Sequence, residues 1–543
     1  MTPNSHTAPP PTIEDAARCY GARDFAGAER IARAIVAADP HHFDALHLLG
    51  VLCLNDHRLA DAAGFLRRAA VERPDDAQLH YHFGNTWLTL KLFDAAEAAF
   101  REALRLNPNH HDAHGNLGNA LAGAGRHRQA VECFRQVLSL QPNVAPNLYN
   151  LARSLAALGH YDEAVTQFRA ALAYAGNAPP DRLADVVAGL CHALIDQERY
   201  PEALVACRDV PPQLYGHPVV EWNESLTRLM LGEYRTGWRL YESRFRVPEH
   251  DPPRPGAQVL DLAAVAGKRV LVFGEQGRGD AIQFARYLPL LAARGAQVIA
   301  EVYPELQALF ATIEGVTQVV GPDDATPPHD LLTPLLSLPL AFGTEVVSIP
   351  AAMSYLSPSA DRVEDWAARL GPHRRPRVGL CWWGAQHIPK RSIPATLLTP
   401  LLARQDLEFH AVQKDIMPSD ADWLERHPDV QVHAAALRDL ADTAALLARM
   451  DLVISIDTAV AHLAGAIGRP VWILLPSSPD WRWFPDREDS PWYPTARLFR
   501  QRRRGDWAEV VQRVAAALAA LSLPPDPPLQ PLPLSLRDED ASA

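Results

Sequence analysis

Three polar residues stand out in the segment DLVISIDTAVAHLAGAIGRPVWILLP, which spans residues 451–476. An apolar run ends at Ile456 and leads directly into Asp457 and Thr458, and His462 follows one helical turn later. Residues four apart share a helix face, and the N–H groups of a helix N-terminus favour an anion. Two interpretations stay open: Asp457 caps the helix, or this segment binds a phosphate-bearing ligand.

A glycine-rich loop, GEQGRGD at 274–280, lies between an apolar strand and the N-terminus of a helix. Gly277 and Gly279 would let a ligand approach the backbone closely. The spacing is not GxGxxG, which argues against ordinary dinucleotide binding. Asp280 either caps this helix or acts as a catalytic carboxylate.

Positive charge for the same ligand is available in AQHIPKRSIP, which follows another apolar run. Lys390 and Arg391 could both reach a phosphate from this loop.

The elements that must position these residues are two groups of parallel strands. Apolar runs without alternation are typical of strands buried on both faces. In the first group, strand 269–273, helix 280–294 and strand 297–302 form a βαβ unit. The strands of the second group are expected at 377–382, 407–412, 430–433, 452–456 and 471–475, with a helix at 442–450. Two doubly wound lobes predict a ligand cleft between them, at the carboxyl ends of the strands.

The N-terminal half repeats with a period of 34 residues, as its prolines at 40, 74, 108 and 142 show. The same period holds for three further sets of positions: a glycine column at Gly50, Gly84 and Gly118; an alanine column at Ala62, Ala96, Ala130 and Ala164; and a bulky column at Leu66, Phe100, Phe134 and Phe168. Small residues let paired helices approach, and each proline ends a helix. About six or seven repeats are expected, the last ending near residue 247.

Composition excludes several classes of protein. The net charge of −12 argues against a general binder of nucleic acid or anionic membranes. None of the six cysteines forms a CxxC pair, so we expect neither a disulfide framework nor a zinc site. No apolar run is long enough for a transmembrane segment and no secretory signal is recognisable, which predicts a cytoplasmic protein.

These patterns predict five segments. We expect disorder at 1–11 and in the proline-rich tail at 523–543, a repeat array at 12–247, and two α/β lobes at 256–360 and 372–520.

The repeat pattern resembles the tetratricopeptide repeat (TPR), a helix-turn-helix unit that stacks into an all-α superhelix. Asn116 and Asn150 occupy equivalent positions on first helices of their repeats. In protein O-GlcNAc transferases, which have a similar layout, asparagines at this position hold peptide backbone. The upstream equivalents are His82 and Leu48, so the series is incomplete here. A peptide in the TPR groove is therefore one expected partner.

A second resemblance rests on GDAIQFARYLP, KRSIP, FHAVQKD, the 451–476 segment and DWRWFPDREDSPWYPTARLFRQ, in that order. Together they resemble bacterial TPR proteins whose C-terminal domains are similar to family 9 glycosyltransferases, the heptosyltransferases of lipopolysaccharide assembly. The resemblance implies a GT-B fold of two Rossmann-like lobes, with a nucleotide-diphosphate sugar bound mainly by the second. It also implies inverting transfer without a metal or other cofactor.

The family's site residues map onto this chain residue by residue. Asp280 matches the general base, while Asp457, Thr458 and His462 match the diphosphate motif Asp-Ser/Thr-Gly-x-x-His. Ala459 replaces the glycine of that motif, and the first lobe is short for the family. Lys390 resembles the phosphate-binding lysine. Gln413 and Lys414 fall where the family contacts the nucleoside.

The leading hypothesis is therefore a glycosyltransferase whose repeats present a protein or glycan acceptor. Two alternatives stay open. One is a non-catalytic TPR scaffold with a degenerate nucleotide-binding domain, and the other is a protein glycosyltransferase similar to the O-GlcNAc transferases.

Overall fold

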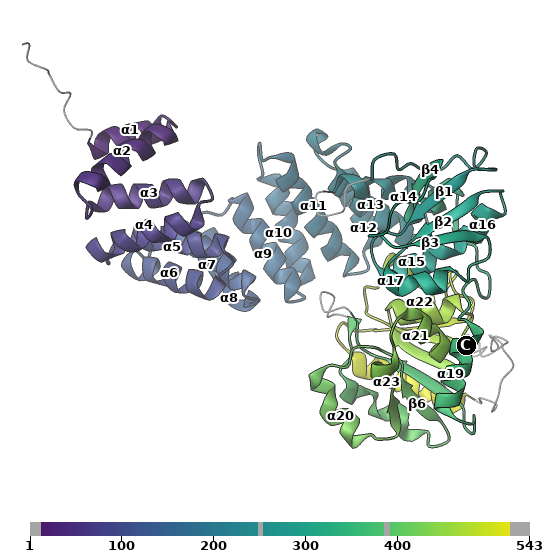
Figure 1. The fold of residues 1–543 in the computed structure, drawn as a ribbon. Coiled ribbons are helices and arrows are strands. Elements are labelled where there is room, and N and C mark those ends of the chain that lie inside the picture. Colours follow the sequence, from purple (N-terminus) through teal and green to yellow (C-terminus); the bar gives the residue numbers. More distant parts are fainter. Residues whose placement is uncertain (1–11, 248–253, 385–390, 522–543) are drawn as a thin grey trace, which may run out of the picture. The chain divides into compact units, whose positions relative to one another are not determined.

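The computed structural model describes residues 12–247, 254–384 and 391–521. It divides into two compact units, one ending at Leu194 and the other beginning at Ile195 (Figure 1). The segments expected to be disordered, 1–11 and 523–543, lie outside the described residues. Among the described residues, no helix has the length and apolar character needed to cross a membrane.

The first unit is built from antiparallel helix pairs. Its helices are α1 (Ile13–Gly21), α2 (Phe25–Ala38), α3 (Phe43–Asn55), α4 (Leu59–Glu72), α5 (Ala77–Thr89), α6 (Phe93–Leu106), α7 (His111–Gly123), α8 (His127–Leu140), α9 (Ala145–Ala157), α10 (Tyr161–Ala173) and α11 (Pro180–Ile195). The prolines at 40, 74, 108 and 142 each lie two residues after the end of α2, α4, α6 or α8. This confirms that they mark the repeat boundaries.

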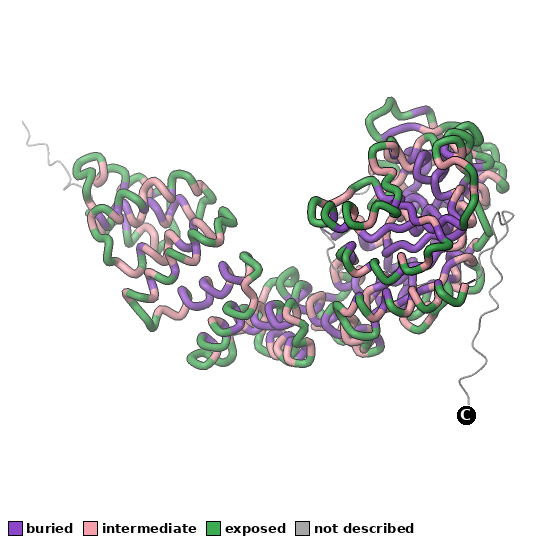
Figure 2. Tube along the Cα trace, turned by 90° about the horizontal axis from the view of Figure 1, so that it is seen from below, coloured by how far each residue is buried: buried purple, intermediate pink, exposed green. Residues whose placement is uncertain are grey.

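The glycine and bulky columns meet inside each repeat. A Cβ atom on Gly84 would lie 2.3 Å from the ring of Phe100, and one on Gly118 would lie 2.7 Å from Phe134. Gly50 has the same relation to Leu66, at 2.5 Å. All four residues of the alanine column are fully buried. Figure 2 shows the buried stretches recurring along these helices. The repeat therefore places glycine where a bulky side chain of the second helix covers the first.

The second unit begins with helices that the repeat pattern also predicted. These are α12 (Tyr200–Arg208), α13 (Pro218–Met230), α14 (Tyr234–Tyr241) and the 3-10 helix η2 (Glu242–Arg246). Trp238 of α14 packs edge-on against Phe284 and Trp481, with ring centroids 6.0 and 5.3 Å apart. The helical segment after residue 195 therefore shares its hydrophobic core with the sheets that follow.

The first sheet of this unit has the strand order β3-β2-β1-β4, and all its pairs are parallel. Its strands are β1 (Arg269–Phe273), β2 (Gln297–Glu301), β3 (Val316–Val320) and β4 (Leu331–Pro334). The helix expected at 280–294 is interrupted: α15 (Arg278–Phe284) and α16 (Leu288–Ala292) flank the 3-10 turn η3 (Ala285–Tyr287). Pro289 explains the break, since it has no N–H to donate to the preceding turn. Other helices here are α17 (Pro304–Phe310), α18 (Leu338–Ala341) and α19 (Ala360–Leu370).

The second sheet has the order β10-β9-β8-β5-β6-β7, again parallel throughout. Its strands are β5 (Arg377–Cys381), β6 (Glu408–Ala411), β7 (Val430–Val432), β8 (Leu452–Ile456), β9 (Val471–Leu475) and β10 (Ala496–Arg500). Its helices are α20 (Ala421–Arg426), α21 (Leu440–Leu447), α22 (Ala459–Ala466) and α23 (Trp507–Ala520), with the 3-10 turn η10 (Trp481–Trp483) before β10.

Each sheet has one point where its strand order reverses. In the first sheet this point lies between β1 and β4, and in the second between β8 and β5. Loops that follow such strands at their carboxyl ends diverge and leave room for ligands. The glycine loop follows β1, Arg391 lies beyond β5, and Asp457 directly follows β8.

Replacing Phe100 by alanine tests the packing of the repeats. The change removes a fully buried ring and leaves a cavity beside Gly84, at a cost of about 3–5 kcal/mol. Amide hydrogen exchange, followed by mass spectrometry, should become faster in α5 and α6. Arg105→Ala on the exposed face of α6 is the control, and equal exchange in both variants would contradict the packing model.

Candidate functional site

The glycine loop between β1 and α15 is held by helices from the start of the second unit. Arg244 of η2 is buried and donates two hydrogen bonds to Glu275, at 3.0 and 2.7 Å. The Tyr241 hydroxyl donates to Gln276 Oε1 at 3.2 Å. Gln276 itself has φ +59°, in the left-handed region. The loop conformation thus depends on these contacts from α14 and η2.

Both carboxylate oxygens of Asp280 have partners in the structure. Asp280 Oδ2 accepts a hydrogen bond from the Gly277 backbone N–H at 2.9 Å, so the residue does cap its helix. Asp280 Oδ1 accepts from the guanidinium of Arg482, which belongs to η10. The Asp280 side chain keeps 19% of its surface exposed. Asp280 can therefore cap its helix and also take part in a reaction.

Gly279 lies directly against the second lobe. A Cβ atom at this position would lie 2.9 Å from His462 Cδ2 and 3.8 Å from Ala459 Cα. Helix α15 accordingly packs against α22. The glycine is needed here because another backbone and a buried ring approach it closely. The residues predicted separately around Asp280 and around His462 thus meet in one place.

Asp457 does not cap α22, contrary to one of the two sequence interpretations. The N-cap residue is Thr458, and its side chain makes no capping hydrogen bond. Asp457 is instead buried and forms an ion pair with Arg391, whose Nη1 atom lies 3.0 Å from Asp457 Oδ2. Burial raises the pKa of the Asp457 carboxyl, against the opposing charge of Arg391. The N–H groups in the first turn of α22 receive no cap from Thr458.

His462 is enclosed by aromatic rings. Its Nδ1 atom lies 2.8 Å from the Tyr493 hydroxyl, and its ring stacks on Trp483 with centroids 5.3 Å apart. Burial, and then the charge of Arg482, lower the pKa of His462 to about 3. The imidazole is therefore neutral near pH 7 and can offer a ligand a hydrogen bond but no charge. Its Nε2 atom lies 3.9 Å from Asp457 Oδ1.

Charged residues from both lobes alternate in sign along one connected network. Arg482 Nη1 pairs with Asp480 at 2.7 Å, and Arg391 reaches both Asp480, at 3.7 Å, and Asp457. Although burial opposes it, the charges of Arg482 and Arg391 lower the pKa of Asp480. With Asp280 at the other end, three carboxylates face two guanidinium groups. We call these five residues the interlobe charge network; its formal charge is −1 when all are ionised.

Three other predicted residues belong to the sequence between β5 and β7. Lys390 falls outside the described residues. Gln413 is buried, and its Oε1 atom accepts hydrogen bonds from the backbone of Trp382 and Trp383, at 2.8 and 3.1 Å. Its Nε2 atom donates to the Asp415 carbonyl at 2.9 Å, so both ends of the amide are engaged. Lys414 is exposed and donates to the Arg438 carbonyl at 3.3 Å.

The predicted asparagines of the repeats belong to a longer chain of amides. Asn150 donates to Asn119 at 2.9 Å, Asn119 to Asn116 at 3.2 Å, and Asn116 to Asn85 at 2.8 Å. We call these four residues the asparagine chain. Asn85 and Asn119 are 34 residues apart, so they form a second periodic pair that the sequence analysis missed.

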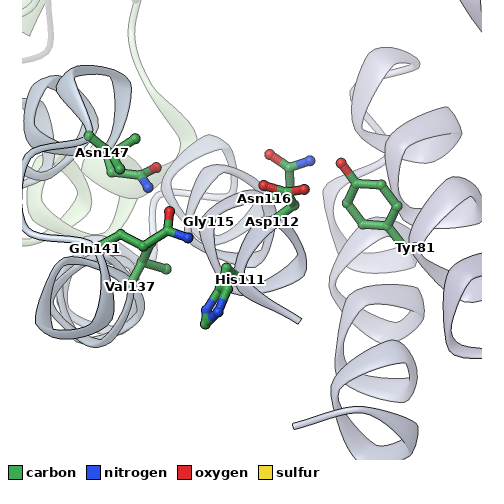
Figure 3. A pocket seen from close by; sticks show the side chains of 9 residues that line it. Tyr81, His111, Asp112, Gly115, Asn116, Val137, Gln141 and Asn147 are labelled. Atoms are coloured by element: carbon green, nitrogen blue, oxygen red, sulfur yellow. The ribbon is translucent and has the colours of Figure 1, made fainter. Parts of the chain in front are cut away.

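A small polar pocket of about 120 Å³ opens beside this chain (Figure 3). Asn116 lies near Tyr81 on one side of it, and Asn147 and Gln141 lie on the other. The remaining lining residues are His111, Asp112, Gly115, Val137 and Val144. Hydrogen-bonding groups and one aromatic ring suit a peptide rather than an apolar ligand.

Two residues of the network were not singled out from the sequence. Asp480 and Arg482 lie in DWRWFPD, a segment that carried the family resemblance but no assigned role. Its density of tryptophan around a charged pair is the signal that could have found them, because aromatic residues bury the charges they flank. Among the described residues, no three His, Cys, Asp or Glu side chains group as metal ligands would.

Replacing Gly279 by alanine tests the contact between α15 and α22. The added methyl group overlaps His462, whose ring cannot turn aside because Trp483 and Tyr493 hold it. We expect a loss of about 1–3 kcal/mol in unfolding free energy. Tryptophan fluorescence during denaturation reports on this unit, since every tryptophan except Trp87 follows residue 195. Gly64→Ala, where the methyl group meets nothing within 4 Å, is the control; equal midpoints would disprove the contact.

Comparison with known proteins gives one curated relative. Protein FlbA of Caulobacter vibrioides is 31% identical over 328 residues, which cover 53% of this chain and 53% of that protein. The chain thus spans about half the length of this relative. A crystal structure of MamA is 26% identical in sequence, with a TM-score of 0.28. The match covers 30% of this chain and 94% of the MamA chain. The structure of Pseudomonas aeruginosa PilF is 19% identical in sequence, with a TM-score of 0.33. The match covers 38% of this chain and 90% of the PilF chain.

Family models match segments in both halves of the chain. Two models described as tetratricopeptide repeat match it, one at 88–145 and the other at 20–81 and 121–183. A model described as glycosyltransferase family 9 (heptosyltransferase) matches 421–505, a range that contains Asp457, His462, Asp480 and Arg482. The chain therefore combines tetratricopeptide repeats in its N-terminal half with a C-terminal glycosyltransferase family 9 domain.

Proposed function

We propose that the chain is an inverting, metal-independent glycosyltransferase that transfers a sugar from a nucleotide-diphosphate sugar to an acceptor presented by the repeats. One observation carries the proposal: Asp280 and the Asp457–His462 segment, from two different parallel sheets, meet where both strand orders reverse. The match to family 9 supports the reaction class. In this proposal the two sheets are the two lobes of a GT-B fold.

Asp280 is proposed as the general base. It takes the proton of an acceptor hydroxyl while that oxygen attacks the anomeric carbon of the sugar. The bond from this carbon to the diphosphate breaks as the new bond forms, and the nucleoside diphosphate leaves with the electron pair. Attack from the face opposite the leaving group inverts the anomeric carbon. A carboxylate within hydrogen-bond reach is suited to this step.

The leaving diphosphate is proposed to lie at the N-terminus of α22. Backbone N–H groups of the first turn, around Thr458 and Ala459, favour an anion there. His462 contributes a neutral hydrogen bond, and Arg391 contributes positive charge from the β5 side. Lys390, the counterpart of the family's lysine, precedes Arg391 directly. Groups fixed in place before the reaction stabilise the developing charge without a metal.

The nucleoside is proposed to lie toward the end of β6. Lys414 is exposed there and can contact the ligand. Gln413 acts indirectly, because its three hydrogen bonds to backbone fix the ends of two loops.

Replacing Asp280 by asparagine tests the base. The amide keeps the shape of the side chain but cannot take a proton at neutral pH. We expect transfer from the productive nucleotide-diphosphate sugar to fall by about 10²–10⁴-fold without weaker donor binding. Sugar transfer or donor hydrolysis is measured across a panel of such donors. Asp489→Asn, an exposed carboxylate in the same unit, should keep full activity; full activity in Asp280→Asn would refute the assignment.

A non-catalytic scaffold remains the second candidate, because both Asp280 oxygens are already occupied and the network carries net negative charge. Thermal-shift measurements with nucleoside diphosphates and nucleotide sugars separate the two functions. Stabilisation by any of them supports a donor site, and no shift with all of them supports the scaffold.

The acceptor is proposed to be a protein segment bound along the asparagine chain. The two inner amides, Asn116 and Asn119, each use one donor and one acceptor within the chain, while Asn150 uses only a donor and Asn85 only an acceptor. Every amide therefore retains at least one N–H and one lone pair for peptide backbone. The neighbouring pocket can take one side chain of the peptide. Protein acceptors would make the enzyme functionally similar to the O-GlcNAc transferases.

The double change Asn116→Ala with Asn150→Ala tests acceptor capture. We expect mass spectrometry to find several-fold less sugar on Ser or Thr of host proteins co-expressed with the variant. Hydrolysis of the donor should stay unchanged, since the donor site is intact. Asn177→Ala, an exposed residue after α10, is the matched control. If both variants modify host proteins equally, the asparagine chain does not hold the acceptor.

A further inference from the structure

Arg482 connects the two halves of the proposed reaction. We propose that it alternates between two partners, the Asp280 carboxylate and the diphosphate of the donor, so that donor binding releases Asp280 to act as base. The proposal rests on the proposed function and adds a residue to which no role has been given. It makes base activation conditional on the presence of the donor.

The contacts of Arg482 place it at the junction of the lobes. Its Nη2 atom donates to Asp280 and its Nε atom to Gln283 Oε1, both on α15, while Nη1 donates to Asp480 on its own loop at 2.7 Å. Its side chain is only 8% exposed. The guanidinium also lies over the Trp481 ring, 4.5 Å from the centroid. A buried cation with three partners holds the lobes together at this point.

While it is bound to Asp280, Arg482 competes with an acceptor hydroxyl for the lone pairs of Oδ1. A general base needs a lone pair directed at the acceptor hydroxyl, about 2.6–3.2 Å away. In the structure, Gly277 occupies Oδ2 and Arg482 occupies Oδ1. The Gly277 hydrogen bond belongs to the helix cap and can persist through catalysis. The Arg482 contact is the one that must change.

Asp480 gives Arg482 a pivot for this change. Its Oδ1 atom accepts hydrogen bonds from both the backbone N–H and Nη1 of Arg482, at 3.2 and 2.7 Å. Its other oxygen, Oδ2, faces Arg391, which also pairs with Asp457 at the start of α22. Arg482 can therefore leave Asp280 while Asp480 still compensates its charge. The guanidinium then moves toward the end of the network nearer α22.

Charge balance drives the exchange. The interlobe charge network has three carboxylates and two guanidinium groups, so a diphosphate adds negative charge to a site that is already negative. A guanidinium matches two phosphate oxygens at once, and phosphate carries more charge than a single carboxylate. The arriving diphosphate therefore competes with Asp280 for Arg482. When this competition succeeds, Oδ1 of Asp280 is left to the acceptor hydroxyl alone.

A double-mutant cycle on binding tests the exchange without any transfer assay. UDP, GDP, ADP and CDP are titrated by calorimetry into the full-length wild type, Asp280→Asn, Arg482→Gln and the double variant. We expect Asp280→Asn to bind the preferred nucleotide about 3–10-fold more tightly, because Arg482 is no longer held. Arg482→Gln should bind it about 10–100-fold more weakly, the loss of a charge-assisted contact. The double variant should bind the nucleotide with the same affinity as Arg482→Gln.

The sign and coupling of these effects decide the outcome. If Asp280→Asn tightens binding equally with and without Arg482, only the removed negative charge matters and the exchange is refuted. Unchanged binding in Arg482→Gln refutes it as well. If none of the four nucleotides binds the wild type, both the donor site and the exchange fail. If the cycle is as expected but Asp280→Asn retains transfer, the base is wrong and the arginine contact stands.

Two further variants keep the test interpretable. Arg502→Gln removes an exposed arginine after β10 and should leave nucleotide affinity at the wild-type value. Arg482→Lys keeps the positive charge but not the bidentate geometry, so it should bind with intermediate affinity. It takes the place of Arg482→Gln in the cycle if tryptophan fluorescence shows that the glutamine variant is unfolded.

Discussion

The second unit depends on one arrangement of charge: two guanidinium groups compensate three carboxylates where its two sheets meet. Asp457 and Arg482 are almost fully buried. Removing one member of a buried ion pair leaves the other uncompensated, which typically costs 3–5 kcal/mol. No member can therefore be changed without affecting its neighbours. The proposed catalytic carboxylate and the proposed phosphate site are linked physically before any ligand is considered.

The helices between residues 195 and 247 have a second role besides continuing the repeat pattern. Arg244 and Tyr241 fix the backbone just before Gly277, and Trp238 packs into the core beneath Phe284. The loop that presents Asp280 is thus built partly by helices from outside its own sheet. This explains how a four-stranded sheet can hold the loop in a defined conformation.

The sequence predicted the periodic and buried elements well. The 34-residue period placed every repeat proline correctly, and β1, β8 and β9 begin and end as expected, because a continuous apolar run has few alternative structures. The sequence missed β3, whose central residues are exposed, the short strand β4 and the edge strand β10. For Asp457 the sequence left two interpretations open, because an acidic residue before a helix is usually a cap; the structure excludes the cap. The preference of Asp457 for Arg391 depends on a contact between segments far apart in the chain, which local patterns do not contain.

The same limit applies to Arg482, whose partners Asp280 and Gln283 lie about 200 residues earlier in the chain. An arginine in a tryptophan-rich segment can equally well face solvent, and only the fold shows that it is buried. Of the site residues proposed from the family resemblance, His462 and Ala459 lie close to Gly279, next to Asp280, whereas Gln413 and Lys414 lie after β6. The family resemblance identified these residues, and the structure shows the contacts between them.

The asparagine chain also has a direction. Every link donates toward the N-terminal repeats, so the amide dipoles add along the array from Asn150 to Asn85. At Asn150 the asparagine chain ends in a side-chain carbonyl oxygen, and at Asn85 it ends in a side-chain amide nitrogen. An extended polypeptide alternates donors and acceptors in an order set by its own N-to-C polarity. A surface of aligned amides would therefore distinguish the two orientations of the proposed bound segment, and would select which end of that segment points toward the repeats nearest residue 194.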